Sequence, residues 1–523
     1  MSAEVVKSSS NSIHSEKDKA VEVITHVKSI EALTDDKIQI NGKVIKLDGG
    51  DQIMKLGLAD DDEIELTPEV EKRLRRKSDM YLLPIMLTLY CLQFMDKLSN
   101  SFSSILGLRA ELNMNGQIYS WTGSAFYLGY LFAEFFMSYA LQKLPLAKTL
   151  SGLVIVWGVI LALHSVANTN GFLALRVLLG MFESSITPGF SMITRQWYRK
   201  EETFFRTSIW FSGNGVGIIL GSLMAYGIDI HRDSMSIEPW KLVFIISGVL
   251  TIAFGIVMFF HLPDSPAQAW FLTDLEKKLI VQRIKGNHQG FGNHHIKKEQ
   301  VIEALTDYRS WIIFASTFVG SIPNGGLTNF GSILMNETFG YSVQQSLLLQ
   351  TIGGAVEFVG LIFIASFSVY IKSRFLWAFV GQCIAVTGMF LLCFAEDKTV
   401  RFAGNCLISV SPLSFIVMLS TVQTNILGST KQSTVFIMLL VGYCIGNLAG
   451  SQTFLATEAP VYRTALNSIA ACAALSLVLL VALWASYAWE NKKRDKRGDK
   501  LEVENVEFLD LTDKQNLNFR YSY

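Results

Sequence analysis

Charged side chains are scarce in this sequence. Only 17% of its 523 residues are Asp, Glu, Lys or Arg, whereas a soluble protein normally carries about 25%. Basic and acidic residues are equally numerous, at 45 each, so the formal net charge is zero and no overall signal for nucleic-acid binding is present. Because half of the residues are hydrophobic, the composition indicates a chain that lies in a lipid bilayer.

Cysteine clusters and catalytic motifs are also absent. The six cysteines all fall inside apolar runs, which is typical of small buried side chains and not of a disulfide framework or a metal site. The sequence contains no HExxH, GxSxG or phosphate-loop motif. We therefore expect no enzyme activity, no catalytic residue, no metal and no cofactor.

The first 79 residues form a polar tail. They lack the basic start and apolar core of a signal peptide, so the first apolar run is expected to serve as the uncleaved insertion signal. Up to about Asp60 the tail is rich in Ser, Lys and Asp, and this composition predicts mostly disordered chain. From Thr67 a short helix is predicted, since Thr67 can cap it and Pro68 suits its first position.

Long hydrophobic runs follow this tail. A helix needs about 20 apolar residues to cross a bilayer. Such runs cover 80–104, 118–141, 149–167, 172–194, 207–228, 240–262, 310–331, 347–371, 374–394, 402–428, 433–455 and 464–489. The pattern predicts an all-α membrane protein with twelve transmembrane helices in two six-helix halves, 80–262 and 310–489. A polar loop, 263–309, joins the halves, and a second polar tail covers 490–523.

The polar loop is predicted to contain an amphipathic helix of its own. Thr273 and Glu276 have the spacing of a capping box. One apolar stripe follows, made of Leu275, Leu279, Ile280 and Ile284. Two positions stay open for this helix, on the membrane surface or against the helix bundle.

Basic residues divide unevenly between the two sides of the predicted bundle. The side that carries both tails has 27 Lys and Arg residues near the membrane, and the other side has six. Because basic residues are retained on the cytoplasmic side, both tails are predicted to be cytoplasmic. The plasma membrane is the favoured location, and an internal membrane such as the endoplasmic reticulum or vacuole is the alternative. The sequon at Asn336 would then face outward.

Ionisable residues inside the apolar runs are the first candidates for function, because each costs about 2.5–3.5 kcal/mol at the centre of a bilayer helix. These residues are Asp96, Lys97, Glu134, Arg176, Glu183 and Glu357. A histidine, His164, lies near the end of the third run and is interpreted as structural.

Four of these residues suggest an anion site with proton acceptors. Arg176 and Glu183 are seven positions apart and share one helix face. If the first and fourth runs line one cavity, Lys97 and Arg176 supply positive charge for an anion, and Asp96 and Glu183 supply carboxylates for protons. The alternative is that the four residues only neutralise each other as structural pairs.

Glu134 and Glu357 are weaker candidates. Each could act in gating or as a proton relay. Each could equally satisfy backbone groups between helices.

Several motifs resemble those of a known transporter family. The arrangement of six helices, a loop and six helices resembles the major facilitator superfamily. The segment 94–100 (FMDKLSN), the segment 176–183 (RVLLGMFE) with Thr187-Pro188-Gly189, and the segment 262–266 (LPDSP) are similar to motifs of its anion:cation symporter family. The segment 126–130 (FYLGY) with Glu134 resembles the fungal branch of allantoate permease-like transporters.

The resemblance assigns roles to individual residues. It implies that Lys97 and Arg176 bind a substrate carboxylate, with Asn100 as a further substrate contact, and that Asp96 and Glu183 couple protons. Two departures stand out: Lys97 occupies a position where the family has arginine, and Asn100 is shifted by one residue. Lysine lacks the planar, two-pronged grip of arginine on a carboxylate.

The combined expectation is a secondary transporter, a proton-coupled symporter of a small organic anion that works by alternating access. Its partners would be this anion, protons and the lipid bilayer, with no nucleic acid, and the chain is expected to be monomeric. A simple carboxylate, a ureido acid, a vitamin acid and a short peptide all stay open as substrates. The alternative is a nutrient sensor of the same fold that does not transport.

Overall fold

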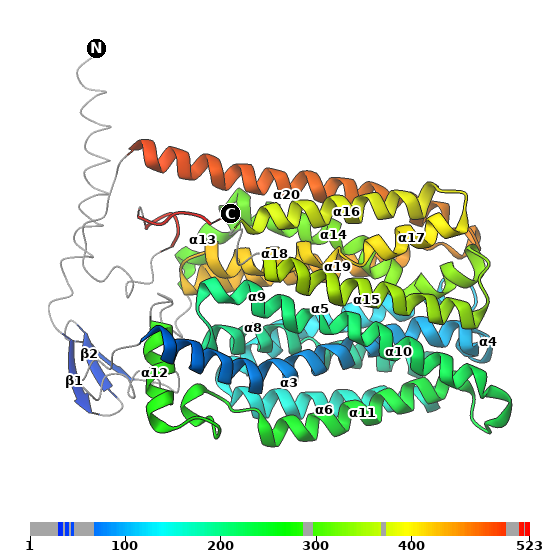
Figure 1. Cartoon of the computed structure of the whole chain (residues 1–523), viewed down its shortest axis with the longest axis horizontal. Coiled ribbons are helices and arrows are strands. Elements are labelled where there is room, and N and C mark those ends of the chain that lie inside the picture. The colour runs from blue at the N-terminus through cyan, green and yellow to red at the C-terminus, as the bar shows by residue number, and fades with distance from the viewer. Residues whose placement is uncertain are drawn as a thin grey trace, which may run out of the picture.

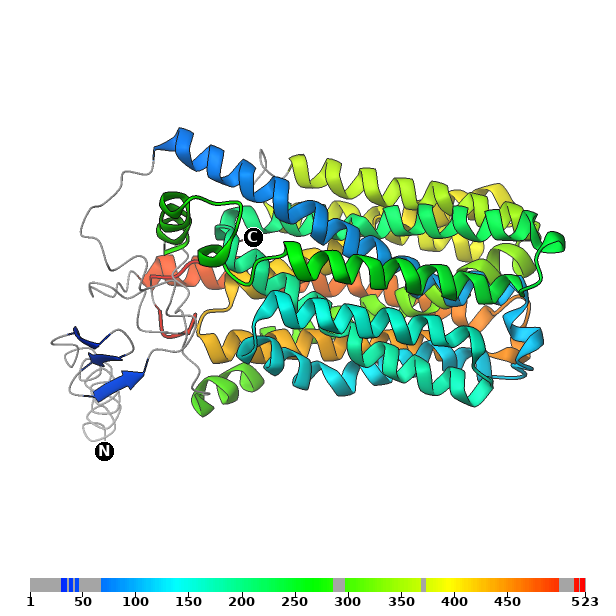
Figure 2. The ribbon, with the colours of Figure 1, turned by 90° about the horizontal axis from the view of Figure 1, so that it is seen from below.

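The computed structural model describes residues 30–34, 37–40, 43–46, 67–285, 297–367, 373–497, 512–516 and 518–522. Long helices that run side by side make up most of it (Figures 1 and 2). The predictions for the rest of the amino-terminal tail, for 286–296 and for 498–511 lie outside the described residues.

The amino-terminal half contains six helical units. They are α3 (Pro68–Ser103), α5 (Ile118–Lys143), α6 (Leu146–Leu163), α7 (Thr169–Glu183) continued by α8 (Ile186–Trp197), α9 (Lys200–Phe211) continued by α10 (Gly213–Ile230), and α11 (Pro239–His261). Each unit coincides with one predicted hydrophobic run. Two of the runs are divided into two helices, at Ser184–Ser185 and at Ser212.

The carboxyl-terminal half repeats this plan. Its units are α14 (Tyr308–Ile333), α15 (Val343–Phe367), α16 (Arg374–Phe394), α17 (Lys398–Ile408) continued by α18 (Pro412–Asn425), α19 (Ser429–Gln452) and α20 (Arg463–Arg497). Within the described residues, nine helices are long and apolar enough to cross a membrane. The other three units, α5, α7 with α8, and α14, carry more small, polar or charged residues, and twelve crossings are consistent with the bundle.

The start of α3 agrees with the sequence in its cap but not in its length. Thr67 accepts a hydrogen bond from the backbone N–H of Val70, and Pro68 is the first helical residue, as predicted. The predicted short helix is not separate, however, because α3 continues for 36 residues to Ser103. Asp79, at the point where a break was expected, is held by two hydrogen bonds from Arg206 of α9, so the polar junction is stabilised as helix.

Three short strands lie within the amino-terminal tail, for which the sequence predicts mostly disordered chain up to about Asp60. Strands β1 (Ile30–Thr34), β2 (Lys37–Ile40) and β3 (Lys43–Lys46) form an antiparallel sheet in the order β1-β2-β3. The signal was present in the sequence: β2 and β3 are rich in Ile and Val, and the dipeptide Asn41-Gly42 between them strongly favours a two-residue hairpin turn.

Several helix pairs join the halves, and the most extensive are α10 on α15 and α5 on α19. The approach of α10 and α15 depends on two glycines. A Cβ atom at Gly215 would lie 2.4 Å from the carbonyl oxygen of Gly354, and one at Gly354 would lie 2.6 Å from that of Gly215. Small residues let helix backbones come this close in a membrane, so this seam is specified by the absence of side chains.

We expect Gly215→Ala to destabilise the protein by about 1–3 kcal/mol, because the added methyl group forces two backbones apart. Gly227→Ala is the matched control on the same helix, since a Cβ there meets nothing within 4 Å, and it should be neutral or stabilising by up to about 1 kcal/mol. Thermal unfolding of the purified variants in detergent measures both. Equal melting temperatures for the two variants would show that the seam tolerates a side chain.

One end of the bundle carries α12 (Asp274–Lys285), α13 (Lys298–Thr306) and the last residues of the chain, and we call this end the tail face (Figure 1). The opposite end, where α4 (Arg109–Glu111) lies, is called the loop face. Helix α12 has the predicted capping box, with reciprocal hydrogen bonds between Thr273 and Glu276. Its stripe residues Leu279, Ile280 and Ile284 are buried, so the helix packs against the bundle. The fourth predicted stripe residue, Leu275, is exposed, because it lies in the first turn of the helix.

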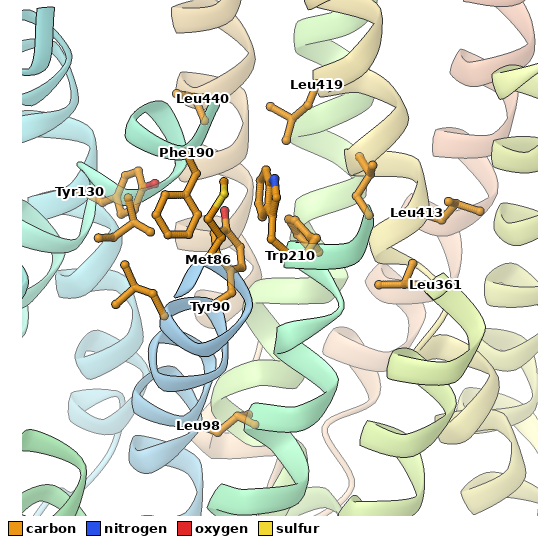
Figure 3. Close-up of a cluster of buried hydrophobic side chains, with 14 of the residues drawn as sticks. Met86, Tyr90, Leu98, Tyr130, Phe190, Trp210, Leu361, Leu413, Leu419 and Leu440 are labelled. Atoms are coloured by element: carbon orange, nitrogen blue, oxygen red, sulfur yellow. The ribbon is translucent and has the colours of Figure 1, made fainter. Parts of the chain in front are cut away.

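An aromatic cluster of the amino-terminal half belongs to a buried hydrophobic core that continues to Leu361, Leu413, Leu419 and Leu440 of the carboxyl-terminal half (Figure 3). The ring of Tyr90 from α3 lies 4.5 Å from that of Trp210 of α9 and 5.7 Å from that of Phe190 of α8. The hydroxyl of Tyr90 also forms a hydrogen bond with that of Thr187. This cluster fixes α3 against α8 and α9, and so sets the position of the polar residues that follow Tyr90 on α3.

Candidate functional site

A cavity of about 220 Å³ lies between the two halves. Its wall in the amino-terminal half includes Tyr90, Gln93, Lys97, Tyr130, Thr187 and Asn214. Its wall in the carboxyl-terminal half includes Asn324, Thr328, Gln350, Glu357, Gln382 and Tyr443. Apolar side chains such as Phe94, Phe211 and Phe415 fill much of the remaining wall. A mostly apolar lining with a limited number of polar groups is typical of a site for a small molecule.

Lys97 is the cationic side chain that lines this cavity in the described part of the chain. Its Nζ atom lies 2.9 Å from Oε1 of Glu183, and Gln93 donates a hydrogen bond of 2.8 Å to the same oxygen. The Lys97 side chain is 12% exposed, and that of Glu183 is fully buried. The ammonium group therefore faces the cavity, and its counterion lies behind it, away from any solute.

Asp96 lies outside the lining of the cavity. It accepts a hydrogen bond of 2.5 Å from Nε1 of Trp157 on α6, and its Oδ1 atom has no hydrogen-bond partner among the described residues. Adjacent side chains on a helix point about 100° apart, so Asp96 faces Trp157 of α6 whereas Lys97 faces the cavity and Glu183. The carboxylate opposite Lys97 is Glu183 and not Asp96.

Arg176 is buried and has no ion pair in the part of the chain that the structure describes. Its guanidinium packs against the rings of Phe172 and Phe244, at 5.4 and 5.8 Å, and its Nε and Nη2 atoms have no hydrogen-bond partner there. It is not part of the cavity lining. Arg176 does not pair with Glu183, which lies two helical turns away and pairs with Lys97 instead.

His164 belongs to the same aromatic surroundings. Its ring stacks on Phe244 at 5.3 Å, and Nδ1 forms a hydrogen bond of 2.9 Å with the carbonyl oxygen of Ile160. These contacts fit the structural interpretation.

Asn100 lies at the contact between the halves, on the loop-face side of Lys97, and does not line the cavity. Its Nδ2 atom donates to Thr122 at 2.9 Å and to Oδ1 of Asn329 at 3.2 Å. Because Asn329 belongs to α14 of the other half, Asn100 is placed to respond to movement between the halves.

The two remaining carboxylates differ in their exposure to the cavity. Glu357 of α15 lines the cavity from the carboxyl-terminal half, and its Oε1 atom has no hydrogen-bond partner within the described ranges. Glu134 of α5 does not line it and accepts a hydrogen bond of 3.2 Å from Ser138. Of the two, only Glu357 can meet a solute in this arrangement.

Contacts between the halves close the space on both sides of the cavity. Towards the loop face, Arg109 pairs with Glu337 at 2.7 Å, and Ser101 donates to Ser332 at 3.0 Å. Towards the tail face, the guanidinium of Arg195 on α8 donates to Oε1 of Gln432 on α19 at 3.2 Å. The cavity thus lies between two separate sets of contacts that join the halves.

Sequence reasoning missed two partners of the buried carboxylates, Gln93 and Trp157. Gln93 is one helical turn before Lys97, on the same face, so its polar side chain inside an apolar run was a usable signal. Trp157 had no comparable signal, since a tryptophan in a membrane helix is common and only the packing of α6 on α3 shows what its N–H meets.

The fold, the two-sided contacts and the central cavity define a membrane transporter of small molecules. The family model of the Major Facilitator Superfamily matches residues 85–451, and the chain belongs to that family, in its allantoate permease-like branch. It is 45% identical over 500 residues to the allantoate permease of Saccharomyces cerevisiae, with 92% of both chains covered. It is 46% identical over 501 residues to an uncharacterised transporter of Schizosaccharomyces pombe, with 94% of this chain and 98% of the relative covered.

Solved structures support the fold. The proton:xylose symporter XylE aligns with a TM-score of 0.61 over 78% of this chain and 96% of that chain, at 13% identity. The family and these relatives are transporters and permeases, so the chain is a multi-pass membrane transporter and not an enzyme.

Proposed function

We propose that the protein is a proton-coupled symporter of a small organic anion. The observation that carries this proposal is the Lys97–Glu183 pair: a cation faces the central cavity while its counterion is buried behind it. An anionic group that enters the cavity competes with Glu183 for the ammonium of Lys97. Lys97 then neutralises the substrate anion, and the negative charge of Glu183 is left without a partner. One further positive charge is needed to neutralise Glu183.

A proton supplies that charge. Once the substrate engages Lys97, Glu183 becomes a buried carboxylate with a weakened partner, which is a costly state inside a membrane protein. Protonation of Glu183 removes the cost, so substrate and proton bind with positive linkage. Asp96 is the second proton acceptor, because one of its oxygens has no partner among the described residues.

Movement between the halves completes the cycle. In this fold family, substrate sites lie at the interface of the two halves, and alternating access comes from rocking of one half against the other. We assign the loop-face contacts at Arg109–Glu337 and Asn100–Asn329, and the tail-face contact at Arg195–Gln432, to the two gates. Glu357, across the cavity from Lys97, is the proposed relay or gating carboxylate, and Glu134 is retained as a second, buried candidate.

The cavity and the relatives support the proposed substrate class. Lys97 favours a carboxylate, and the amide side chains of Asn214, Gln350 and Gln382 favour further hydrogen-bonding groups. Simple carboxylates, ureido acids, vitamin acids and short peptides meet these conditions. The relative from S. cerevisiae is named for allantoate, which places that anion first in the panel to be tested.

Proton-driven uptake of a labelled panel of these acids by cells that produce the protein is the test. We expect uptake of at least one acid to rise with an inward proton gradient and to collapse with a protonophore. Saturable binding of the same acid to the purified protein without any uptake would identify the alternative, a nutrient sensor of the same fold.

We place the protein in the plasma membrane as a monomer. In the proposed orientation, the tail face lies on the cytoplasmic side. This orientation rests on the 27 to six distribution of basic residues. An epitope tag at either end of the chain should resist protease added to intact cells, and both should be cleaved after permeabilisation. Cleavage of either tag in intact cells would overturn this orientation.

Arg176 gives a prediction of its own. Its guanidinium lies against two phenylalanine rings, and both this packing and a two-pronged hold on a carboxylate need a planar group. We expect Arg176→Lys to lose most of the uptake and Arg176→Ala to abolish it, with protein levels at the membrane measured in parallel. Normal uptake and apparent affinity in Arg176→Ala would show that the residue only fills space between α7 and α11.

A further inference from the structure

The last residues of the chain are folded back into the tail face of the carboxyl-terminal half. Residues 512–516 and 518–522, which we call the strap, lie beside the ends of α13, α14, α18, α19 and α20 (Figure 1). Within the strap, the side chains of Thr512, Asp513 and Tyr521 are 0%, 1% and 3% exposed. Burial of this degree indicates a built binding site for the strap.

The strap completes a buried ionic cluster around Lys431, the third residue of α19. The ammonium group of Lys431 is fully buried and lies 2.6 Å from Asp513 of the strap, 2.9 Å from Glu303 of α13 and 3.3 Å from Asp307 at the start of α14. Thr512 of the strap donates a hydrogen bond of 2.9 Å to the other oxygen of Glu303. Removing one partner from such a buried cluster is strongly destabilising.

Asp307 is ionised at neutral pH. Burial by itself would raise the pKa of Asp307, but the nearby ammonium groups of Lys431 and Lys514 outweigh it and lower the pKa below its usual range. The carboxylate of Asp307 therefore carries the negative charge that its ion pairs with Lys431 and Lys514 require.

Tyr521 anchors the other end of the strap. Its ring stacks on Tyr487 of α20 at 4.8 Å and lies 5.0 and 4.9 Å from the guanidinium carbons of Arg309 and Arg494. Its hydroxyl donates a hydrogen bond of 2.6 Å to Asp513 and accepts one of 3.1 Å from Arg309. The backbone of Tyr521 exchanges two hydrogen bonds with the side chain of Asn491. Aromatic, ionic and backbone contacts thus all recognise this one residue.

The strap also reaches the connection between α18 and α19. The side chain of Asn425, the last residue of α18, donates a hydrogen bond of 2.9 Å to the carbonyl oxygen of Ser522 and accepts one of 3.0 Å from its N–H. Lys431 and Asn425 bracket this connection, so the strap holds it at both ends.

This connection supplies one side of the contact between the halves at the tail face. Gln432, the residue after Lys431, donates to the carbonyl oxygens of Val422, Gln423 and Ile426 and so fixes the end of α18. The same side chain accepts the hydrogen bond from Arg195 of the other half. The position of Gln432 therefore depends on how firmly its neighbour Lys431 is held.

We propose that the strap is a conformational control element, an intramolecular ligand whose docking stabilises closure of the tail face. With the strap bound, the α18–α19 connection is held where Gln432 meets Arg195. When the strap leaves, Lys431 and Asn425 lose partners, the connection gains freedom, and the closed tail face is less populated. Any agent that competes for the Lys431 cluster or for the Tyr521 slot would then shift the transporter between its two access states. The inference needs no particular substrate and no proton coupling.

The test uses a reporter cysteine at Ser191, which is buried on α8 beside Gln423 and Gln432 at the tail face. Full-length Ser191→Cys protein, purified and reconstituted in nanodiscs without substrate, is reacted with a bulky maleimide, and the rate is corrected for the six native cysteines with the parent chain. We expect Tyr521→Ala, and deletion of residues 512–523, each to increase the labelling rate about tenfold, which corresponds to the loss of one hydrogen bond to a charged group.

A matched control and a rescue separate this role from general instability. Arg520 is the neighbour of Tyr521 in the strap, and its ion pair with Asp495 lies on the surface. Arg520→Ala should therefore leave the labelling rate unchanged. A synthetic peptide of residues 510–523, added to the truncated protein, should restore slow labelling, and the same peptide with Tyr521→Ala should not. Unchanged labelling after truncation, or labelling that the intact peptide fails to slow, would overturn the proposal. Either result leaves the proposed transport function untouched, since no transported substrate enters the measurement.

Discussion

Lys97→Ala should abolish uptake of the anionic substrate. Lys97 is the cationic side chain that lines the cavity in the described residues, and its removal also leaves the buried carboxylate of Glu183 without its ion-pair partner. Truncating one member of a buried charge pair costs about 2–5 kcal/mol, so apparent affinity should fall by roughly 30-fold to several thousand-fold. Uptake kinetics together with equilibrium binding to the purified protein measure this loss.

Two further variants are controls for Lys97→Ala. Lys97→Arg keeps the charge and restores the residue type of the family motif that segment 94–100 resembles, so it should retain uptake. Lys143→Ala removes an exposed cation at the end of α5, and it should transport like the parent. Undiminished affinity in Lys97→Ala, with normal amounts of folded protein, would place the anion elsewhere.

Glu183→Gln should separate substrate movement from the proton gradient. Glutamine is uncharged at every pH, so the variant mimics the protonated carrier, and its side-chain oxygen can still accept the hydrogen bonds that Gln93 and Lys97 now direct at Glu183. We expect exchange of labelled for unlabelled substrate to continue, while accumulation driven by an inward proton gradient falls at least about tenfold, the effect of about 1.4 kcal/mol of lost coupling. Proteoliposomes measure both activities on the same preparation.

Asp96→Asn addresses the second proposed proton acceptor. Asparagine can still accept the hydrogen bond from Trp157, so the packing of α3 on α6 should survive and only the titration is lost. Its accumulation should also fall, with exchange retained. Glu201→Gln, at an exposed carboxylate of α9, serves as the control. If Glu183→Gln and Asp96→Asn both still concentrate substrate in response to the proton gradient, the coupling groups lie at other positions, with Glu357 the next to be tested.

The amino-acid sequence by itself determined the helices of the bundle, because a bilayer imposes one length and one composition on every helix that crosses it. The runs at 240–262 and 374–394 coincide with α11 and α16 almost to the residue. Local capping chemistry was equally predictable, since Thr67 and the Thr273–Glu276 pair act through neighbours a few positions away. The same locality explains why the ionisable candidates inside the apolar runs could be named before any contact was known.

Only the tertiary structure decided which of those candidates meet. Spacing on α7 put Arg176 and Glu183 on one face, yet Glu183 pairs with Lys97 of another helix, and Arg176 packs against aromatic rings. The docking of the chain's end on Lys431 was likewise hidden, because Asp513 and Tyr521 lie in a polar tail with no periodic pattern. Contacts of this kind join residues 82 to 212 positions apart, and their geometry is fixed by how the helices pack. Periodicity within one helix specifies a face, whereas the partner of that face is set by the packing of the whole bundle.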